Sequence, residues 1–171
     1  MAHITLRTLE KEDIPFIHKL FNDPAIMSYW FEEAYHSKGT LEESFDKNKE
    51  SPHTRSFIID HAGEDIGLVQ LLFIDTISRN AEFAIMIDPQ HQGKGYSHLA
   101  TQQAIDYAFQ TLNLHKLYLW ADETNEKAIH IYKKHGFTVD AVLHEHFYVN
   151  GSYRNTVIMN IFQRDYYANQ S

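Results

Sequence analysis

The sequence predicts a mixed α/β domain, because strand-like and helix-like patterns alternate through the middle of the chain. A nearly all-apolar stretch at 80–88 is typical of a buried strand. The segment at 99–112 then repeats apolar residues at three-to-four spacing, as an amphipathic helix does. Another strand-like stretch at 116–122 and another helical one at 124–136 follow. With 43% apolar and 22% charged residues, the chain suits one soluble domain over residues 1–171.

Caps and turns divide the rest of the chain. Asn150-Gly151 lies between two strand-like runs and is a two-residue hairpin signal. Thr124 or Asn125 can cap the start of the last helix, and Gly136 ends it. The expected elements, in order, are a strand at 3–9, helices at 12–23, 24–31 and 40–50, strands at 55–60, 65–75 and 80–88, a helix at 96–112, a strand at 116–122, a helix at 124–136, and a hairpin of 137–149 with 152–162.

The composition and net charge limit the classes of binding partner that the protein can have. A formal net charge of −8 disfavours nucleic acid, because phosphate backbones are bound by basic surfaces. An acidic protein attracts cations and polycations, although negative charge also serves solubility. The absence of cysteine excludes disulfides and thiol catalysis, as expected of a cytoplasmic protein. The N-terminus lacks a signal-peptide pattern and no run reaches membrane-spanning length, so we expect no membrane partner.

A glycine-containing loop, Gln92-Gly93-Lys94-Gly95, joins the apolar strand to the amphipathic helix. Free N–H groups at a helix start, together with the helix dipole, can bind an anion such as a phosphate. A tight turn with no ligand is an equally simple interpretation of the loop alone. The loop does not match G-x-x-x-x-G-K-[ST], nor does it have the third glycine of G-x-G-x-x-G. The sequence therefore disfavours a nucleoside triphosphate and a nicotinamide dinucleotide.

The same loop resembles the pyrophosphate loop of the GNAT N-acetyltransferases, patterned [Q/R]-x-x-G-x-[G/A]. Gln92 and Gly95 match the pattern, and Ser97 stands where a final Gly or Ala is usual. The resemblance implies the GNAT acyl-CoA N-acyltransferase fold, an α/β fold with a splayed central sheet and flanking helices. It also implies acetyl-CoA as co-substrate, with the pantetheine arm lying between the strands at 80–88 and 116–122.

Five blocks resemble the branch of this superfamily that acetylates polyamines such as spermidine and spermine: "MSYWFEE", "AEF", "LNLHKLYL", "NEKAIHIY" and "YVNGSYRN". The resemblance implies that the polyamine is bound by Met27, Glu32, Glu33, Glu82, Phe83 and Ala84. It implies that coenzyme A is bound by Ile85, Met86, Ile87, Gln92, Gly93, Lys94, Gly95, Tyr96, Ser97, His98, Asn125, Lys127, Ala128 and Tyr132. It further implies a homo-oligomer, since the family forms dodecameric rings.

Acetyl transfer to an amine requires a neutral nucleophile, a donor for the developing oxyanion and a hydrogen bond to the leaving thiolate. Glu82 lies in an otherwise apolar strand and is the candidate proton acceptor, although an outward-facing strand carboxylate would look the same. Tyr132 shares a helical face with Asn125 and could equally be a core tyrosine. The resemblance implies that Tyr132 is the proton donor to the thiolate. It also places the oxyanion donor on a backbone N–H near 85–87.

The region before residue 51 is acidic. Glu42, Asp46 and Glu50 recur at four-residue spacing, which fits a polycation-binding face or a solvated one. The resemblance implies a second, regulatory polyamine site here. In the family a glutamate aligned with Phe73 can hold a divalent cation with Glu32. Because Phe73 offers no ligand oxygen, we predict no metal.

The sequence leaves two alternatives to polyamine acetylation. One is a GNAT enzyme that acetylates protein N-termini or another small amine. The other is a polyamine or acyl-CoA sensor without turnover, which the presence of Tyr132 disfavours.

Overall fold

The computed structural model describes residues 3–171, and within that range a seven-stranded sheet has the order β1-β2-β3-β4-β5-β7-β6. The strands are β1 (Thr5–Thr8), β2 (Arg55–His61), β3 (Glu64–Asp75), β4 (Asn80–Ile87), β5 (Lys116–Asp122), β6 (Thr138–Val149) and β7 (Ser152–Phe162). The helices are η1 (Lys11–Asp13), α1 (Ile14–Phe21), α2 (Pro24–Met27), α3 (Lys38–Asn48), η2 (Pro89–His91), α4 (Tyr96–Asp106), the π-helical η3 (Tyr107–Thr111), α5 (Glu126–Lys134) and α6 (Gln163–Ala168).

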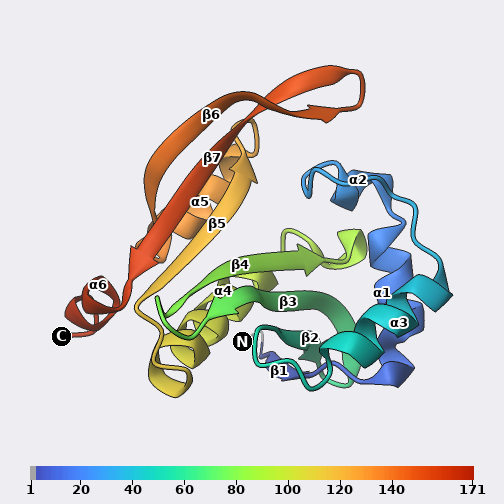
Figure 1. The fold of residues 1–171 in the computed structure, drawn as a ribbon, viewed down its shortest axis with the longest axis horizontal. Helices are drawn as coiled ribbons and strands as arrows, with labels where there is room; N and C mark the ends of the chain where they lie inside the picture. Colours follow the sequence, from blue (N-terminus) through green and yellow to red (C-terminus); the bar gives the residue numbers. More distant parts are fainter. Residues whose placement is uncertain (1–2) are drawn as a thin grey trace.

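The sheet opens in its middle, as expected from the resemblance. β4 and β5 are parallel and pair only from Asn80 with Lys116 to Glu82 with Tyr118. The remaining neighbours in the sheet are antiparallel. Beyond Glu82 the two strands diverge, so that β1–β4 form one half of the molecule and β5, β7 and β6 form the other (Figure 1). The backbone of 83–87 therefore has one edge free of strand pairing on the β5 side.

Two hydrophobic clusters cover opposite faces of the first half of the sheet. Val69, Leu71 and Phe83 belong to the cluster that contains α4, whereas Leu68 and Met86 belong to the one with α1 and α3. The alternation follows from the two-residue period of a strand, which sends successive side chains to opposite faces. Residues of even number in β4, such as Glu82, thus point towards the α1–α3 side, and residues of odd number point towards α4.

Two of the expected helices end before the predicted residue. The helix expected at 24–31 ends at Met27, since Phe31 adopts a left-handed φ of 57° that no α-helix can contain. The helix expected at 40–50 ends at Asn48, which leaves Glu50 outside it. Asp46 forms ion pairs with Lys11 and Lys49 there, so part of the expected acidic face is already neutralised.

The C-terminal α6 follows β7 directly and was not expected, because its six residues are too short to show a helical period. Tyr166 connects α6 to α4, because its hydroxyl group donates a hydrogen bond to Asp106 at 2.6 Å. No helix within residues 3–171 is long and apolar enough to cross a membrane.

Candidate active site

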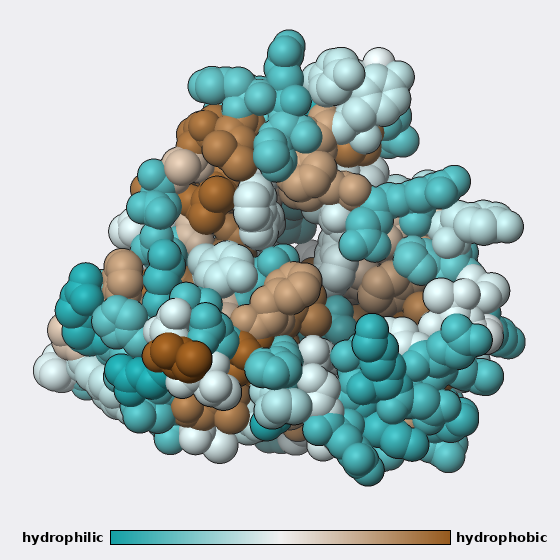
Figure 2. Space-filling model, in the orientation of Figure 1, coloured by the Kyte–Doolittle hydropathy of each residue, from teal (hydrophilic) through white to brown (hydrophobic). Residues whose placement is uncertain are grey.

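A cavity of about 1030 Å³ lies where the sheet opens. Its walls come from β4, the η2–α4 loop, the start of α5, β5, the turn after α2 and the β6–β7 hairpin. In the space-filling view, a hollow separates the hairpin from the N-terminal helices (Figure 2). The volume is at the upper end of what small-molecule sites span, so the cavity can hold a large cofactor together with a second ligand.

The loop that closes one end of the cavity is held in shape by its own side chains and by Lys19 of α1. Asp88 accepts hydrogen bonds from the Gln90 backbone N–H at 3.1 Å and from the Lys19 ammonium. Burial raises the pKa of Asp88, but these bonds outweigh it and hold the pKa below its ordinary value. The Gln92 amide donates to the Ile87 carbonyl at 3.1 Å, which ties the loop back to the end of β4.

Gly95 is the N-cap of α4 and has a φ of 83°, a conformation that L side chains rarely adopt. A Cβ built at Gly93 or Gly95 would meet no atom within 4 Å, so both glycines border open space. The N–H groups of the first turn of α4 have no partner inside the helix. The loop is thus an open cradle at a helix N-terminus, which is the chemistry that a pyrophosphate requires.

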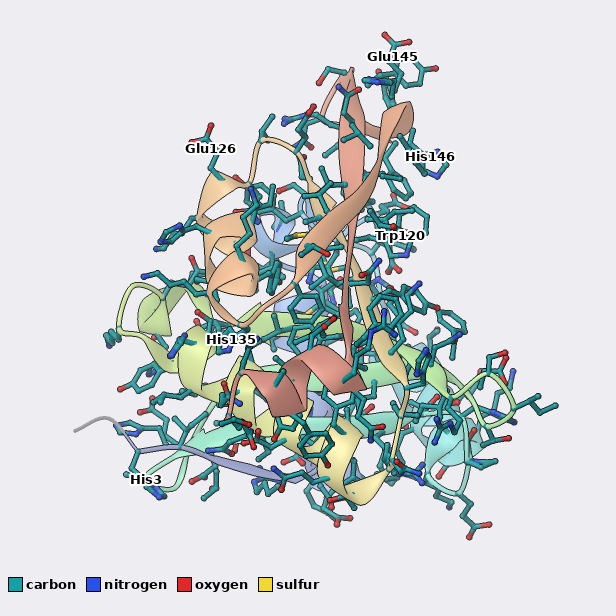
Figure 3. All side chains as sticks on the ribbon, turned by 90° about the vertical axis from the view of Figure 1, so that its left-hand side faces the viewer. His3, Trp120, Glu126, His135, Glu145 and His146 are labelled. Carbon is teal, nitrogen blue, oxygen red and sulfur yellow. The ribbon has the colours of Figure 1, made fainter. Side chains whose placement is uncertain are left out.

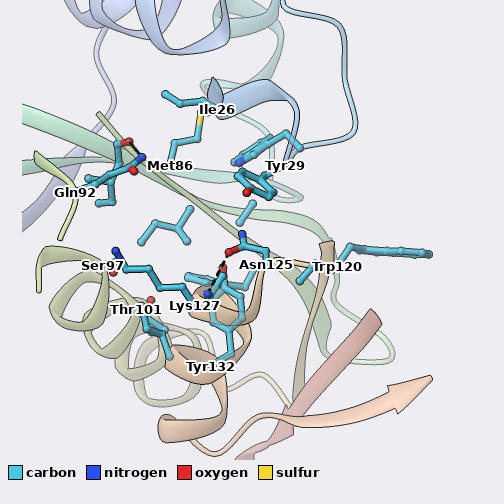
Figure 4. A pocket seen from close by; sticks show the side chains of 18 of the residues that line it. Ile26, Tyr29, Met86, Gln92, Ser97, Thr101, Trp120, Asn125, Lys127 and Tyr132 are labelled. Carbon is cyan, nitrogen blue, oxygen red and sulfur yellow. Dashed lines mark hydrogen bonds between the residues drawn. The ribbon is translucent and has the colours of Figure 1, made fainter. Parts of the chain in front are cut away.

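Opposite this loop, α5 begins at an Asx turn. Asp122 accepts hydrogen bonds from the Thr124 backbone at 2.8 Å and hydroxyl at 2.6 Å, and its carbonyl accepts from the Asn125 N–H. Asn125 is the helix cap, since its side-chain oxygen accepts from the Ala128 N–H at 3.3 Å. Of the two caps expected, Asn125 is therefore the one used. Asn125 and Tyr132 both line the cavity, and they lie about two turns apart along α5 (Figure 4).

Tyr132 lies at the bottom of this part of the cavity. Its ring contacts Phe83 edge to face, at 6.1 Å between centroids, and Phe137 at 5.9 Å. Burial raises the pKa of Tyr132 to about 12. The hydroxyl group therefore keeps its proton throughout the neutral range and acts as a hydrogen-bond donor.

Two buried polar atoms in the cavity wall have no hydrogen-bond partner within residues 3–171, the Thr101 hydroxyl and the His91 Nδ1 atom. The Thr101 side chain is fully buried, and its hydroxyl makes no hydrogen bond within residues 3–171. Buried hydroxyl groups are normally hydrogen-bonded, because leaving one unsatisfied costs about 1–3 kcal/mol. Thr101 lies one turn after Ser97 on α4 and faces the cavity (Figure 4). A polar ligand in the slot between α4 and α5 would satisfy it, so this slot fits the amide-rich pantetheine arm of coenzyme A.

Glu82 occupies the other side of the opening. Its side chain is half-buried, and burial raises its pKa above the ordinary value, with a second contribution from the charge of Glu32. Glu32 is itself 56% exposed and lies 4.0 Å from the His36 imidazole. Both carboxylates line the cavity. A carboxylate with a raised pKa is a stronger base than one in water, which suits a proton acceptor.

Most of the residues predicted from the sequence line this one cavity. From the predicted set these are Glu32, Glu82, Phe83, Ala84, Ile85, Met86, Ile87, Gln92, Gly93, Gly95, Tyr96, Ser97, Asn125, Lys127, Ala128 and Tyr132. Four predicted residues lie outside the lining. Met27 is 1% exposed within the core beneath α2, whereas Glu33, Lys94 and His98 are exposed.

The cavity also contains residues that the sequence did not single out. These are Thr101, His91, Trp120 and Phe147, whereas Tyr29, Trp30 and Phe31 belong to the block "MSYWFEE" but had no assigned role. Trp120 could have been found from the two-residue period of the strand at 116–122. This period places Trp120 on the same face of the sheet as Tyr118. Phe147 had no local signal, because a long hairpin brings it to the cavity.

The family model described as an acetyltransferase (GNAT) domain matches residues 3–138. The chain belongs to the GNAT acetyltransferases. It is 47% identical over 168 residues to the spermidine N(1)-acetyltransferase of Escherichia coli K12, covering 98% of this chain and 90% of that protein. It is 45% identical to the spermidine N(1)-acetyltransferase of Vibrio cholerae, covering 96% of each.

Solved structures agree with this membership. The crystal structure of spermidine N-acetyltransferase from Vibrio cholerae in complex with CoA and spermine superposes with a TM-score of 0.94 at 45% identity. The match covers 96% of this chain and 98% of that one. The predicted GNAT fold, the acetyltransferase class and acetyl-CoA as the co-substrate are therefore confirmed.

Proposed function

We propose that this GNAT enzyme transfers an acetyl group from acetyl-CoA to a primary amine of a polyamine, by direct attack in a ternary complex. The observation that carries the proposal is a single cavity with two chemically different sides. The side of α4 and α5 offers a helix N-terminus, the unpaired Thr101 hydroxyl and Tyr132. The side of α2 offers Glu32 and Glu82 together with aromatic residues of the same lining, which suits an organic cation.

The co-substrate supplies an activated acetyl group as a thioester. On the protein, Glu82 binds the ammonium group and then takes its proton, directly or through water, so that the amine attacks as a neutral nucleophile. The new C–N bond forms as the C–S bond breaks, and a backbone N–H from 85–87 donates to the oxygen of the carbonyl. Tyr132 donates a hydrogen bond to the departing sulfur.

The raised pKa of Tyr132 limits its role. An ordinary thiol has a pKa of about 8.5, roughly 3.5 units below that of Tyr132, so complete proton transfer would be uphill by roughly 5 kcal/mol. Tyr132 therefore stabilises the thiolate by hydrogen bonding, and the final proton comes later from solvent.

The test is turnover with a panel of amines. Acetyl-CoA is incubated with spermine, spermidine, putrescine and N-terminal peptides, and thiol release is measured. The proposal expects spermidine and spermine to exceed the peptides by at least tenfold in kcat/KM. Faster turnover of peptides would assign the enzyme to N-terminal acetylation, and CoA binding without turnover of any amine would make it a sensor.

The further proposals are that residues 1–171 act as one acetyltransferase domain in the cytoplasm, and as a homo-oligomer. Exposed apolar side chains support an interface between copies, among them Tyr35 at 81%, Phe73 at 68% and Ile77 at 94% exposure. Light scattering coupled to size-exclusion chromatography tests the oligomer, and a monomer at micromolar concentration would contradict it.

A further inference from the structure

We propose that Trp120 forms a cation–π subsite for the second ammonium group of the polyamine. This group is separated by one three- or four-carbon chain from the amine that Glu82 binds. The inference rests on the proposed function and gives it a means of distinguishing a polycation from a simple amine. It follows from the register of β4 and β5, from the packing around the indole and from the charge of the cavity.

The register places Glu82 and Trp120 on the same face of the sheet. Glu82 pairs with Tyr118 across the parallel strands, so their side chains point to the same side. Trp120 is two residues further along β5 and points to that side as well, whereas Leu117 and Leu119 are buried on the opposite face. Trp120 and Tyr132 accordingly lie on different sides of the cavity (Figure 4).

The spacing matches that of a polyamine. Trp120 lies roughly 6.6 Å along β5 from Tyr118, and Tyr118 lies one inter-strand distance of roughly 4.8 Å from Glu82, so the backbones of Glu82 and Trp120 are roughly 8 Å apart. An extended three-carbon spacer separates two nitrogens by about 5 Å and a four-carbon spacer by about 6 Å, from ordinary bond lengths. A polyamine whose first ammonium group is bound by the Glu82 carboxylate therefore brings its next ammonium group within the cation–π reach of about 6 Å from the Trp120 ring.

The indole is held in place by the β6–β7 hairpin. The His146 imidazole stacks on it at 5.8 Å and 17°, and Phe147 contacts it edge to face at 6.3 Å. Phe147 is stacked in turn on Phe31 at 4.1 Å and 9°, which joins the hairpin to the turn after α2. Trp120, on β5, and His146, on β6, lie on the side of the molecule opposite to Glu126 and His135 (Figure 3). His146 lies outside the cavity lining, so it supports the indole from behind.

The charge of the cavity favours a cation at this ring. Glu32 and Glu82 line the same cavity, and their carboxylates attract a polycation to it. Tryptophan is the aromatic side chain that binds cations best, at up to about 6 Å from the ring centroid. Both cation–π contacts within residues 3–171 are made by Lys116 and Arg164 with Phe162. No lysine or arginine of the described chain therefore occupies the face of Trp120.

The test compares Trp120→Leu, which removes the π system, with Trp120→Phe, which keeps a weaker one. Calorimetry with the CoA-bound protein measures the binding of spermidine, 1,4-diaminobutane and butylamine. The diamine and butylamine share their carbon chain and differ in the second charge. We expect Trp120→Leu to weaken spermidine and diamine binding by about 2- to 30-fold, with Trp120→Phe in between. Butylamine binding should change by less than about twofold.

Tyr148→Leu is the matched control, because Tyr148 follows Phe147 on β6, is 65% exposed and contacts Tyr153 away from the cavity. It should bind all three amines as the wild type does. Equal losses for diamine and butylamine in Trp120→Leu, or no loss for either, would overturn the subsite. If the Trp120 subsite is overturned but the wild type acetylates spermidine normally, the proposed function stands without the subsite. If the wild type acetylates no polyamine, both proposals fall.

Discussion

Glu82 lies opposite Tyr118 in the last parallel pair of β4 and β5, so the carboxylate is at the point where the sheet opens. Its environment is partly apolar and includes the negative charge of Glu32, and both effects raise its pKa. The Glu82 charge contributes in turn, after burial, to a raised pKa of Tyr118. The carboxylate that we propose as the proton acceptor thus lies at the vertex of the splay.

The first prediction concerns the titration of Glu82 in the substrate-free protein. Carbon-detected NMR should give a midpoint above the ordinary value of about 4.3 for glutamate. Glu32→Gln should lower this midpoint, because removing a negative neighbour makes ionisation of Glu82 easier. Glu33→Gln is the charge-matched control and should shift the midpoint less, since Glu33 lies outside the cavity. A midpoint at or below the ordinary value would contradict the assignment of Glu82 as a strengthened base.

The upward shift of the Glu82 pKa determines how activity and stability depend on pH. Glu82 can accept a proton only when ionised, so activity should fall as the pH is lowered through its raised pKa. Folding favours the protonated form of such a group. Its contribution to stability is therefore greatest at low pH and is lost as the pH rises through the folded-state pKa.

The second prediction concerns the leaving group. Tyr132→Phe should lower kcat by roughly 10- to 1000-fold, because a positioned proton or hydrogen-bond donor is lost. The phenyl ring keeps the contacts with Phe83 and Phe137, so the affinity for coenzyme A and the melting temperature should change little. Single-turnover kinetics and calorimetry measure the two effects. Near-normal kcat in the folded variant would exclude Tyr132 from the mechanism.

The wild-type tyrosine should not limit activity at high pH. With a pKa of about 12, Tyr132 stays protonated up to at least about pH 10. A loss of kcat at lower alkaline pH that disappears in Tyr132→Phe would show that burial raises its pKa less than the structure indicates.

Local patterns predicted the elements that position the coenzyme. The strand 80–88, the glycine loop and the helix after it form one continuous segment, and their periods and caps are properties of neighbouring residues. The strand at 116–122 was predicted with the bounds that the structure gives. The end of α2 was missed because Ser28 to Trp30 continue as isolated turns rather than a helix, and the sequence shows no glycine or proline to stop it.

Long-range pairing determines the rest of the site. The splay became predictable only through the resemblance, since no period reveals that β4 and β5 separate after Glu82. Phe147 reaches the cavity because the hairpin of β6 and β7 is long and contains an irregularity between Leu143 and Phe147, where Glu145 has a φ of 49°. A positive φ at a glutamate has no sequence signature. The aromatic wall around Trp120 was therefore invisible before the fold was known.

The third prediction concerns the glycine cradle. Gly95→Ala should weaken acetyl-CoA binding by about tenfold or more, because the added methyl group enters the space in which the backbone approaches a phosphate. It also strains a residue at a φ of 83°. Gly63→Ala is the matched control, with a φ of 85°, open space around the Cβ and a place in the β2–β3 turn. Both variants should lose similar stability, of about 1 kcal/mol, and only Gly95→Ala should lose affinity for the coenzyme.

A result in which both glycine variants bind coenzyme A as the wild type does would reduce the loop to a structural turn. Equal losses of affinity would attribute the effect to strain. The comparison thus separates conformational cost from contact with the phosphate, which a single substitution at Gly95 cannot do.

The last prediction separates the roles of Glu82 and Glu32. Glu82→Gln should lower kcat as well as affinity for spermidine and spermine, because it removes both a charge-assisted contact of about 1.5–3 kcal/mol and the proton acceptor. Glu32→Gln should mainly raise KM, since its carboxylate is 56% exposed and therefore forms a weaker contact than the half-buried Glu82. Added salt should weaken the contribution of Glu32 more than that of Glu82, because exposed charges are screened more than buried ones. Initial rates of both variants with spermine, spermidine and a monoamine measure the difference. Equal losses on all three amines would show that these carboxylates do not distinguish a polycation from a single ammonium group, and would leave a GNAT enzyme of broader amine specificity.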